Sequence, residues 1–246
     1  MNTKVVDAHQ HLGDCCVFDL NVTEEYLMEG LEQNNIDLTI VQPCPGARRP
    51  EEAHARVAAL ARKHPDRIRG LACLSPHQPE EQYFNQTRQW IEEHGFVGVK
   101  LHTVGHAVSP VSADAEKVFR TAVRLGVPVM IHTGAGVPFS LPSLVIPMAR
   151  QYPELKIVLA HSGSGLYSLE ALVVAQECPN VHLETSWCSV GDIAWFVRTV
   201  GADRVMFGAD IVSNIPIELA KYGTTDMGDE ERHTCLSETA IRVFGL

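Results

Sequence analysis

Two histidines lie two residues apart near the start of the chain, in the run Asp7-Ala-His9-Gln-His11. The preceding apolar residues predict a strand, and side chains two apart on a strand face the same side. Two imidazoles on one face form a suitable pair of metal ligands. The pair alone could equally be two unrelated polar residues at a strand end, because short motifs often occur by chance. Asp7 is expected to support the start of the strand rather than to bind metal.

Four other apolar segments end in residues of similar chemistry. These segments are Gly98-Val-Lys100-Leu-His102, Met130-Ile-His132-Thr-Gly, Leu159-Ala-His161-Ser-Gly and Phe207-Gly-Ala-Asp210. Each has an ordinary explanation on its own: a core histidine, a helix-capping aspartate or a buried lysine paired with it. Their combination at the ends of five separate segments favours one shared site.

Short apolar segments and helical segments alternate along the chain. The apolar segments are rich in Val, Ile and Leu and mostly unalternated, which is typical of parallel strands buried on both faces. The strands expected from this pattern cover residues 5–8, 38–42, 68–74, 97–101, 127–132, 156–161, 181–184 and 204–208. The helices expected between them cover residues 23–33, 51–63, 80–93, 114–125, 141–151, 166–176, 192–199 and 230–243. Two prolines, Pro142 and Pro147, weaken the helix expected at 141–151.

Eight strand–helix units predict a single-domain α/β fold, a (β/α)8 TIM barrel over residues 1–246. The rival is an open doubly wound sheet, which would normally carry a glycine-rich phosphate loop after its first strand. Here the first strand leads into His9-Gln-His11 instead. Chemistry in such barrels lies at the carboxyl ends of the strands, where the histidines, Lys100 and Asp210 are expected to meet.

Composition excludes several classes of protein. The formal net charge is -10, which argues against nucleic-acid binding because phosphate contacts need clustered Lys and Arg. No stretch is apolar for long enough to span a membrane, and the first residues lack the pattern of a signal peptide. The sequence therefore predicts a cytoplasmic protein. Its 7 cysteines have no regular spacing and no Cys-x-x-Cys pair, so neither a disulfide framework nor a zinc knuckle is expected.

The order His-x-His, Lys, His, His, Asp on strands one, four, five, six and eight resembles the amidohydrolase superfamily of metal-dependent barrels. The closer resemblance is to its amidohydrolase-related branch, which includes aminocarboxymuconate-semialdehyde decarboxylase and the hydroxybenzoate-type decarboxylases. The four segments quoted above carry this resemblance, together with the chain's ending, Glu238-Thr-Ala-Ile-Arg242-Val-Phe-Gly-Leu246. It covers essentially the whole chain, and its motifs are specific for the superfamily rather than for a substrate.

The resemblance implies His9, His11, His132 and Asp210 as ligands of a single Zn²⁺, Mn²⁺ or other divalent ion. Such an ion lowers the pKa of bound water. Asp210 would carry protons between this water and the leaving group, and His161 would orient the water or polarise the substrate. A two-ion site stays open, in which Lys100 is carboxylated and His132 and His161 hold the second ion. One ion is favoured over two.

Several residues in loops at the same mouth are candidates for contacts with the substrate. Arg48, or its neighbour Arg49, could bind a carboxylate, although a solvated surface charge is an equal alternative. His102 and His106 follow strand four. Trp187 follows strand seven and could pack over a ring or merely close a lid.

Three functions compete. The first is hydrolysis of a small amide, ester or lactone by a metal-activated water. The second is metal-dependent non-oxidative decarboxylation of a small unsaturated or aromatic carboxylic acid. The third is a non-catalytic ligand-binding barrel, which the complete set of six site residues disfavours. A small-molecule substrate is expected in an open site, because 246 residues leave little room for lid insertions, and a homodimer is a common outcome for such proteins.

Overall fold

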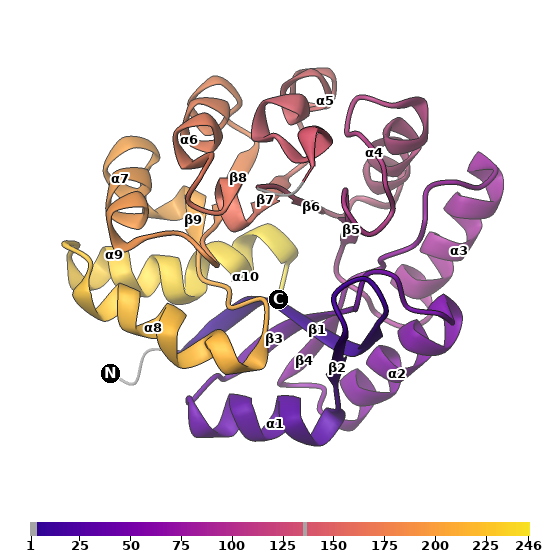
Figure 1. Ribbon diagram of the computed structural model, residues 1–246, viewed down its shortest axis with the longest axis horizontal. Coiled ribbons are helices and arrows are strands. Elements are labelled where there is room, and N and C mark those ends of the chain that lie inside the picture. The colour runs from indigo at the N-terminus through magenta and orange to yellow at the C-terminus, as the bar shows by residue number, and fades with distance from the viewer. Residues whose placement is uncertain (1–3, 135–136) are drawn as a thin grey trace.

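The computed structural model describes residues 4–134 and 137–246, and within them eight parallel strands form the centre of the molecule (Figure 1). In chain order they are β1 (Val6–Cys15), β3 (Leu38–Pro43), β4 (Ile68–Gly70), β5 (Val99–Leu101), β6 (Val129–His132), β7 (Ile157–Ala160), β8 (Val181–Glu184) and β9 (Val205–Met206). A further short strand, β2 (Leu20–Val22), pairs antiparallel with the end of β1. Every residue of β3, β5, β7 and β8 is buried, as expected for strands covered on both faces.

The strands close into a barrel through two parallel bridges. The bridge Ala72–Val99 joins β4 to β5, where the Lys100 amide donates to the Ala72 carbonyl at 2.8 Å. The bridge Gln10–Asp210 joins the segment after β9 to β1, where the Asp210 amide donates to the His9 carbonyl at 2.7 Å. The predicted single-domain TIM barrel is confirmed, and its closing seam brings Asp210 beside the His-Gln-His run.

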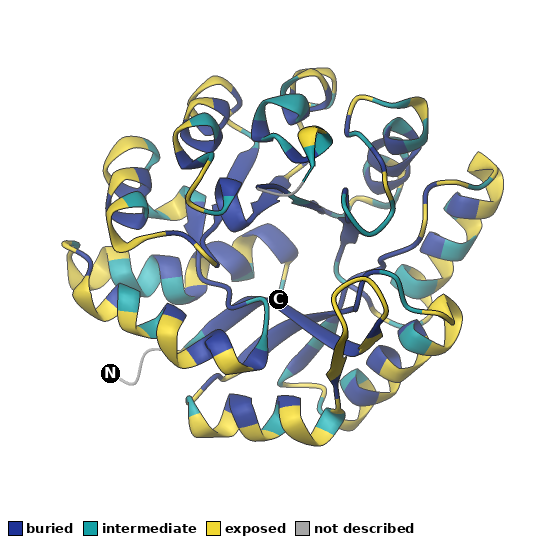
Figure 2. Cartoon of the chain, in the orientation of Figure 1, coloured by how far each residue is buried: buried dark blue, intermediate teal, exposed yellow. Residues whose placement is uncertain are grey.

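Helices form a ring outside the strands (Figure 1). They are α1 (Glu24–Gln33), α2 (Pro50–Lys63), α3 (Glu80–Glu92), α4 (Ala113–Leu125), α5 (Ile146–Gln151), α6 (Ser168–Glu177), α7 (Val190–Val200), α8 (Ile215–Thr224), α9 (Asp229–His233) and α10 (Thr239–Phe244). Except in α9, which has no buried residue, the buried residues of these helices face the strands and the exposed residues face outward (Figure 2). Side-chain caps start several of them: Thr23, Ser112 and Ser189 each accept a hydrogen bond from a backbone amide in the first turn.

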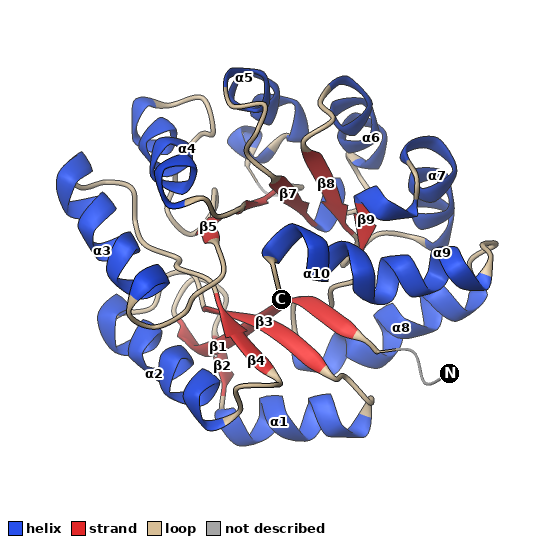
Figure 3. Cartoon of the chain, turned by 180° about the vertical axis from the view of Figure 1, so that it is seen from behind, coloured by secondary structure: helices blue, strands red, loops and turns tan. Residues whose placement is uncertain are grey.

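Helix α10 closes the end of the barrel opposite the carboxyl ends of the strands. Inward-facing strand residues such as Val6, Ile40 and Met130 form a buried cluster with Val243 and Phe244 of this helix. In Figure 3, which shows the barrel from behind, α10 lies across its centre. The larger core cluster lies between the strands and the outer helices. Because one end is filled with apolar side chains, the polar residues of the strands gather at the other.

The observed elements differ from the expected ones in several places. The first strand extends to Cys15, so His9 and His11 lie within it rather than after its end. The expected strand 68–74 stops at Gly70. The expected helix 141–151 is broken into short turns around Pro142 and the helix α5, because proline removes a backbone donor. Helix α8 and strand β2 were not expected. Among the described residues, no helix is both long enough and apolar enough to cross a membrane.

Candidate active site

The barrel seam places His9, His11 and Asp210 around one point. Asp210 Oδ1 lies 3.4 Å from His9 Nε2 and 3.2 Å from His11 Nε2. The three donor atoms all lie within 4.8 Å of one another, as the ligands of one metal ion must. His9 and His11 share a face because they are two residues apart on β1, which confirms the geometry predicted from the sequence.

Asp7 ties this seam together from below. Its Oδ1 accepts hydrogen bonds from the backbone amides of His9 at 3.0 Å and Ala209 at 3.1 Å, and its Oδ2 accepts one from the Gln10 side chain at 2.8 Å. Complete burial raises the pKa of Asp7 to about 7. Asp7 therefore fixes the two chain segments that carry the candidate ligands, and it is not among the donors that lie within 4.8 Å of one another.

The hydrogen bonds of His9 and His11 leave a lone pair on each Nε2 atom. The Lys100 ammonium lies 3.1 Å from His9 Nε2, and the Gln42 side-chain amide lies 3.2 Å from His11 Nε2, so a bound cation would replace these donors. His9 Nδ1 lies 2.8 Å from Glu184 Oε2, and His11 Nδ1 lies 3.3 Å from the Pro43 carbonyl. Because these oxygens accept, each Nδ1 carries the hydrogen and each Nε2 presents a lone pair. Two lone pairs and a carboxylate oxygen then converge. That donor set fits a divalent ion such as Zn²⁺ or Mn²⁺, and it supports the metal predicted from the sequence.

Lys100 lies beside this group rather than within it. Its buried ammonium is 3.1 Å from His9 Nε2. Burial lowers the pKa of Lys100 to about 8, against the opposing charge of Asp210. A second group of three donors, His9, His161 and Glu184, also lies within 4.8 Å, but His9 Nδ1 is already hydrogen-bonded to Glu184. The geometry therefore favours one ion over two.

His132 and His161 form a second histidine pair next to the first. His161 Nε2 lies 3.1 Å from His132 Nδ1, and the rings of His161 and His9 stack with centroids 4.9 Å apart. His132 is outside the donor groups that lie within 4.8 Å in the described structure, so its predicted role as a ligand stays a prediction. His161 lies immediately after β7, within reach of Asp210.

Burial keeps these histidines neutral. It lowers the pKa of His161 to about 4 and takes those of His9 and His132 well below the ordinary value. Burial alone would raise the pKa of Asp210, but His161, His11 and His9 together hold it well below its usual range. Neutral imidazoles around an ionised carboxylate are the protonation states that metal binding requires.

A cavity of about 470 Å³ opens above the candidate ligands. Its walls are mainly apolar and aromatic, and its floor is polar; the lining residues are His11, Cys15, Phe18, Leu20, Cys44, Pro45, His102, His132, His161, Ser164, Trp187, Asp210 and Ile211. Phe18 and Leu20 come from the β1–β2 hairpin, which arches over the mouth. A cavity of this size and lining suits a small, largely apolar molecule with a few polar groups.

Two predicted substrate residues, His102 and Trp187, lie in this cavity. His102 Nδ1 accepts a hydrogen bond from the Gly105 amide at 3.0 Å. Burial and the neighbouring His132 keep the pKa of His102 well below its ordinary value, so its Nε2 carries a hydrogen that can be donated. Trp187 is 46% exposed, and its indole N–H donates to Asp210 Oδ2 at 2.8 Å. His102 thus supplies a donor, and Trp187 fixes the orientation of Asp210.

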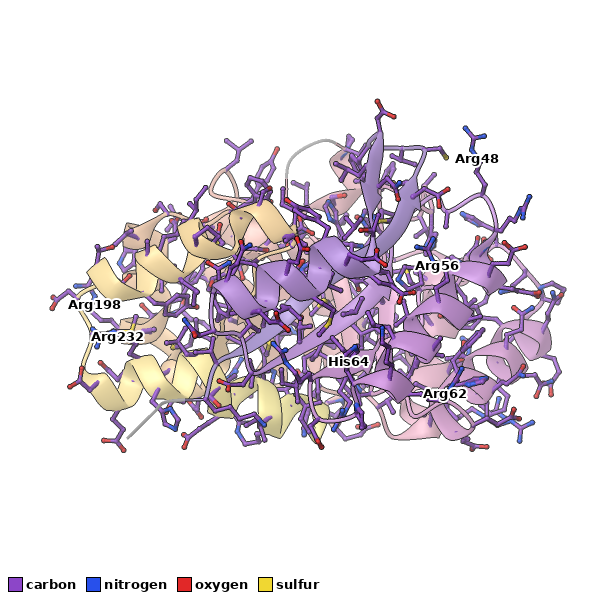
Figure 4. The ribbon with its side chains drawn as sticks, turned by 90° about the horizontal axis from the view of Figure 1, so that it is seen from below. Arg48, Arg56, Arg62, His64, Arg198 and Arg232 are labelled. Carbon is purple, nitrogen blue, oxygen red and sulfur yellow. The ribbon has the colours of Figure 1, made fainter. Side chains whose placement is uncertain are left out.

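Arg48, Arg49 and His106 lie elsewhere. Arg48 and Arg49 are exposed and line a separate cavity with Arg56, and Figure 4 shows Arg48 extending outward beside the β1–β2 hairpin. His106 lines another cavity, of about 220 Å³. The described lining of the central cavity contains no Lys or Arg. The structure therefore does not bring the predicted arginine together with the other site residues.

Glu184 is the buried residue that sequence reasoning missed. It ends β8 at the same edge of the barrel, and its side chain is fully buried against His9. The available signal was a carboxylate at the end of an otherwise apolar strand. Four residues that line the cavity, His161, Ser164, Trp187 and Asp210, also adopt left-handed backbone conformations, with φ of 67°, 51°, 66° and 68°. Such conformations are costly for residues other than glycine and commonly occur at functional sites.

The sequence of residues 38–246 matches the family described as Amidohydrolase. The chain belongs to the amidohydrolase family. No curated protein matches the chain in sequence. The predicted resemblance to the amidohydrolase superfamily is confirmed. The prediction of an enzyme, rather than a non-catalytic ligand-binding barrel, is confirmed with it.

Solved structures with the same fold include three aromatic-acid decarboxylases. The 2,6-dihydroxybenzoate decarboxylase from Rhizobium superposes with a TM-score of 0.77 at 17% identity, over 99% of each chain. The 5-carboxyvanillate decarboxylase from Novosphingobium aromaticivorans, complexed with manganese, gives 0.78 at 18% identity, over 100% of this chain and 97% of its own. A dihydroxybenzoic acid decarboxylase from Polaromonas, with bound manganese and 2-nitroresorcinol, gives 0.77 at 19%, over 99% and 97%. At these identities the likeness establishes the barrel fold.

Proposed function

We propose that this amidohydrolase-family protein is a metal-dependent, non-oxidative decarboxylase of a small aromatic or unsaturated carboxylic acid. The observation that carries the proposal is that His11 and Asp210 line a cavity with aromatic and apolar walls, while the fully buried His9 places its donor atom within 4.8 Å of theirs. The solved decarboxylases of aromatic acids share its fold over nearly the whole chain, which supports the same class of substrate. The hydrolase expected first from the sequence becomes the second candidate.

His9, His11 and Asp210 would hold the ion, with His132 as a further candidate ligand. A bound divalent ion supplies positive charge against a substrate carboxylate and an adjacent oxygen. His102 would donate a hydrogen bond from Nε2 to the same polar end of the substrate. Phe18 and Trp187 would cover the ring. This arrangement recognises an anionic acid without an arginine, in agreement with the uncharged walls of the cavity.

Decarboxylation needs one proton at a defined carbon. The bond between that carbon and the carboxylate breaks, CO₂ leaves, and the bonding electron pair stays on the carbon and takes up the proton. We assign this proton transfer to Asp210: its ionised carboxylate would first take a proton from water or from a substrate hydroxyl and then deliver it to the carbon, while the Trp187 indole N–H holds Oδ2 in place. His161, stacked against His9 and bonded to His132, would orient the reacting group.

The test is a substrate panel on protein loaded with Mn²⁺ or Zn²⁺. The panel pairs aromatic acids, such as 2,6-dihydroxybenzoate and 5-carboxyvanillate, with small esters, lactones and amides. In D₂O, decarboxylation should release CO₂ and leave one deuterium on the carbon that carried the carboxylate. Turnover should disappear in Asp210→Asn. Acid release from esters or lactones without CO₂ would refute the decarboxylase assignment and support the hydrolase.

A further inference from the structure

Glu184 is a hub of hydrogen bonds beneath the candidate site. Its fully buried carboxylate accepts from His9 Nδ1 at 2.8 Å, from the backbone amides of His161 at 3.0 Å and Ser186 at 2.6 Å, and from the Ser186 hydroxyl at 2.9 Å. An ionised carboxylate has no hydrogen, so backbone amides and a hydroxyl that contact it must be the donors. Both oxygens are therefore acceptors, and His9 must carry its hydrogen on Nδ1.

The Ser186 hydroxyl fixes in the same way which nitrogen of a second histidine carries the hydrogen. Ser186 Oγ has one hydrogen, which it donates to Glu184 Oε2. It lies 2.8 Å from His161 Nδ1, so in that contact it must accept, and His161 carries its hydrogen on Nδ1. Neutral His161 then has a bare Nε2.

The contact between His161 and His132 fixes the position of the hydrogen on a third imidazole ring. His161 Nε2 lies 3.1 Å from His132 Nδ1. Because the bare nitrogen accepts, His132 donates from Nδ1, and its own Nε2 is left bare. In the chain Glu184–Ser186–His161–His132, each group therefore donates its hydrogen to the group before it. His9 likewise donates to Glu184.

We propose that Glu184 is the positioning residue that sets the tautomer of His9, His161 and His132, so that each of the three carries its hydrogen on Nδ1 and has a bare Nε2. This assignment does not depend on which bond the enzyme breaks. The Lys100 ammonium, which can only donate, lies 3.1 Å from His9 Nε2 and independently requires a bare nitrogen there. A divalent ion would use the same lone pair on His9 and, if it joins the ligands, on His132.

Gly208 provides the space that the carboxylate occupies. A Cβ atom at position 208 would lie 2.4 Å from Glu184 Oε1, closer than real atoms approach. The glycine two residues before Asp210 therefore lets the Phe207-Gly-Ala-Asp210 segment pass directly over Glu184. The segment that carries the candidate metal ligand Asp210 is therefore packed directly against the positioning residue Glu184.

The test compares three variants of the full chain. Glu184→Gln keeps the shape but replaces the acceptor-only group with an amide that donates from one end. Ser186→Ala removes only the branch to His161 and His132. Glu218→Gln is the matched control, because Glu218 is equally buried but accepts from Trp187, Asn214 and Lys221. The measurement is ¹⁵N NMR of metal-free protein labelled at its histidines, in which protonated and bare ring nitrogens resonate far apart.

The wild type should show bare Nε2 atoms at His9, His132 and His161. Glu184→Gln should change the ring signals of all three histidines, Ser186→Ala only those of His161 and His132, and Glu218→Gln none. Mn²⁺ titration should show weaker binding in Glu184→Gln by 10- to 100-fold, the usual effect of removing an outer partner of a ligating histidine. A protonated Nε2 at His9 or His161 in the wild type, or an unchanged spectrum in Glu184→Gln, would overturn the proposal. If Glu184→Gln does not fold, the wild-type spectrum and Ser186→Ala decide.

Discussion

Asp210 makes a different contact with each of its two oxygens, and this division has a measurable consequence. Oδ1 faces His9 and His11, while Oδ2 accepts the indole N–H of Trp187 at 2.8 Å. Trp187→Phe keeps a ring at the mouth but removes this donor. We expect kcat/KM to fall about tenfold, since a hydrogen bond to a charged group contributes roughly 1.5 kcal/mol. Trp195→Phe, at an exposed tryptophan on α7, should change kcat/KM little; equal losses in both variants would contradict the role of Trp187.

Gly208 gives a second prediction at the scale of single residues. Gly208→Ala would force a methyl group against Glu184 Oε1, and four hydrogen bonds hold that carboxylate in place. We expect divalent-ion affinity to fall at least tenfold, because the partner of His9 is displaced. Gly223→Ala is the control, since a Cβ there meets nothing within 4 Å. Isothermal titration with Mn²⁺ measures both; unchanged affinity in Gly208→Ala would exclude this packing constraint.

Residue types and strand ends were enough to predict most of the candidate site. His9, His11 and Asp210 meet as expected because each lies at the carboxyl edge of a barrel strand. Glu184 escaped prediction because its partner, His9, is 175 residues away in sequence and no local pattern connects them. Arg48 was linked to the cavity by its position after β3, but the chain there turns outward.

At the scale of elements, His54 connects helix α2 to the segment that follows β4. Its Nδ1 donates to the Pro50 carbonyl at 2.6 Å, and its Nε2 accepts from the Cys73 amide at 2.9 Å. Burial lowers its pKa from 6.5 to about 4. Between these values the unfolded chain binds a proton that the folded protein does not, so stability must fall as pH drops from 6.5 toward 4.

His54→Gln should remove this part of the pH dependence, because an amide does not titrate. The loss of unfolding free energy between pH 6.5 and 4 should be smaller in the variant by about 3 kcal/mol. Urea unfolding at a series of pH values measures the difference between the two proteins. Parallel curves for wild type and variant would show that His54 is not buried in its neutral form.

Helix α10 is the element that seals the barrel. Phe244 is 5% exposed and packs with Val243 into the cluster of inward-facing strand residues. Phe244→Ala should lower the unfolding free energy by about 3 kcal/mol or more, the usual cost of a large-to-small change in a core. Ile217→Ala on α8, where the side chain is 58% exposed, is the control and should cost little. Comparable losses at both positions would contradict the sealing role of α10.

Element boundaries were less predictable than element types. Alternating apolar segments and helical periods were enough to predict eight strands. The first strand runs seven residues further than expected because β3 pairs with it as far as Leu12 and β2 pairs with Gly13–Cys15. That pairing depends on the hairpin, whose residues carry no strong turn signal. Helix α8 was missed because proline at its start and glycine near its end hide its period.

At the scale of the whole molecule, the residues that stabilise the barrel interior and the residues of the candidate site lie at opposite ends of the barrel. Apolar residues and α10 fill one end, while the opposite end carries the ligand group and the cavity. The formal net charge of the chain is -10, whereas the described lining of the cavity contains Asp210 but no Glu, Lys or Arg. The predicted homodimer and cytoplasmic location stay predictions. The fold thus explains how a single seam between the first and last strands can assemble the site.

The metal content of the purified protein tests this account most directly. After dialysis against Mn²⁺ or Zn²⁺ and removal of free ion, elemental analysis should find one ion per chain in the wild type. The double variant His9→Ala/His11→Ala should bind none, while circular dichroism should show that its barrel remains folded. Full retention of metal in the double variant, or two ions per chain in the wild type, would contradict a single centre built from His9, His11 and Asp210.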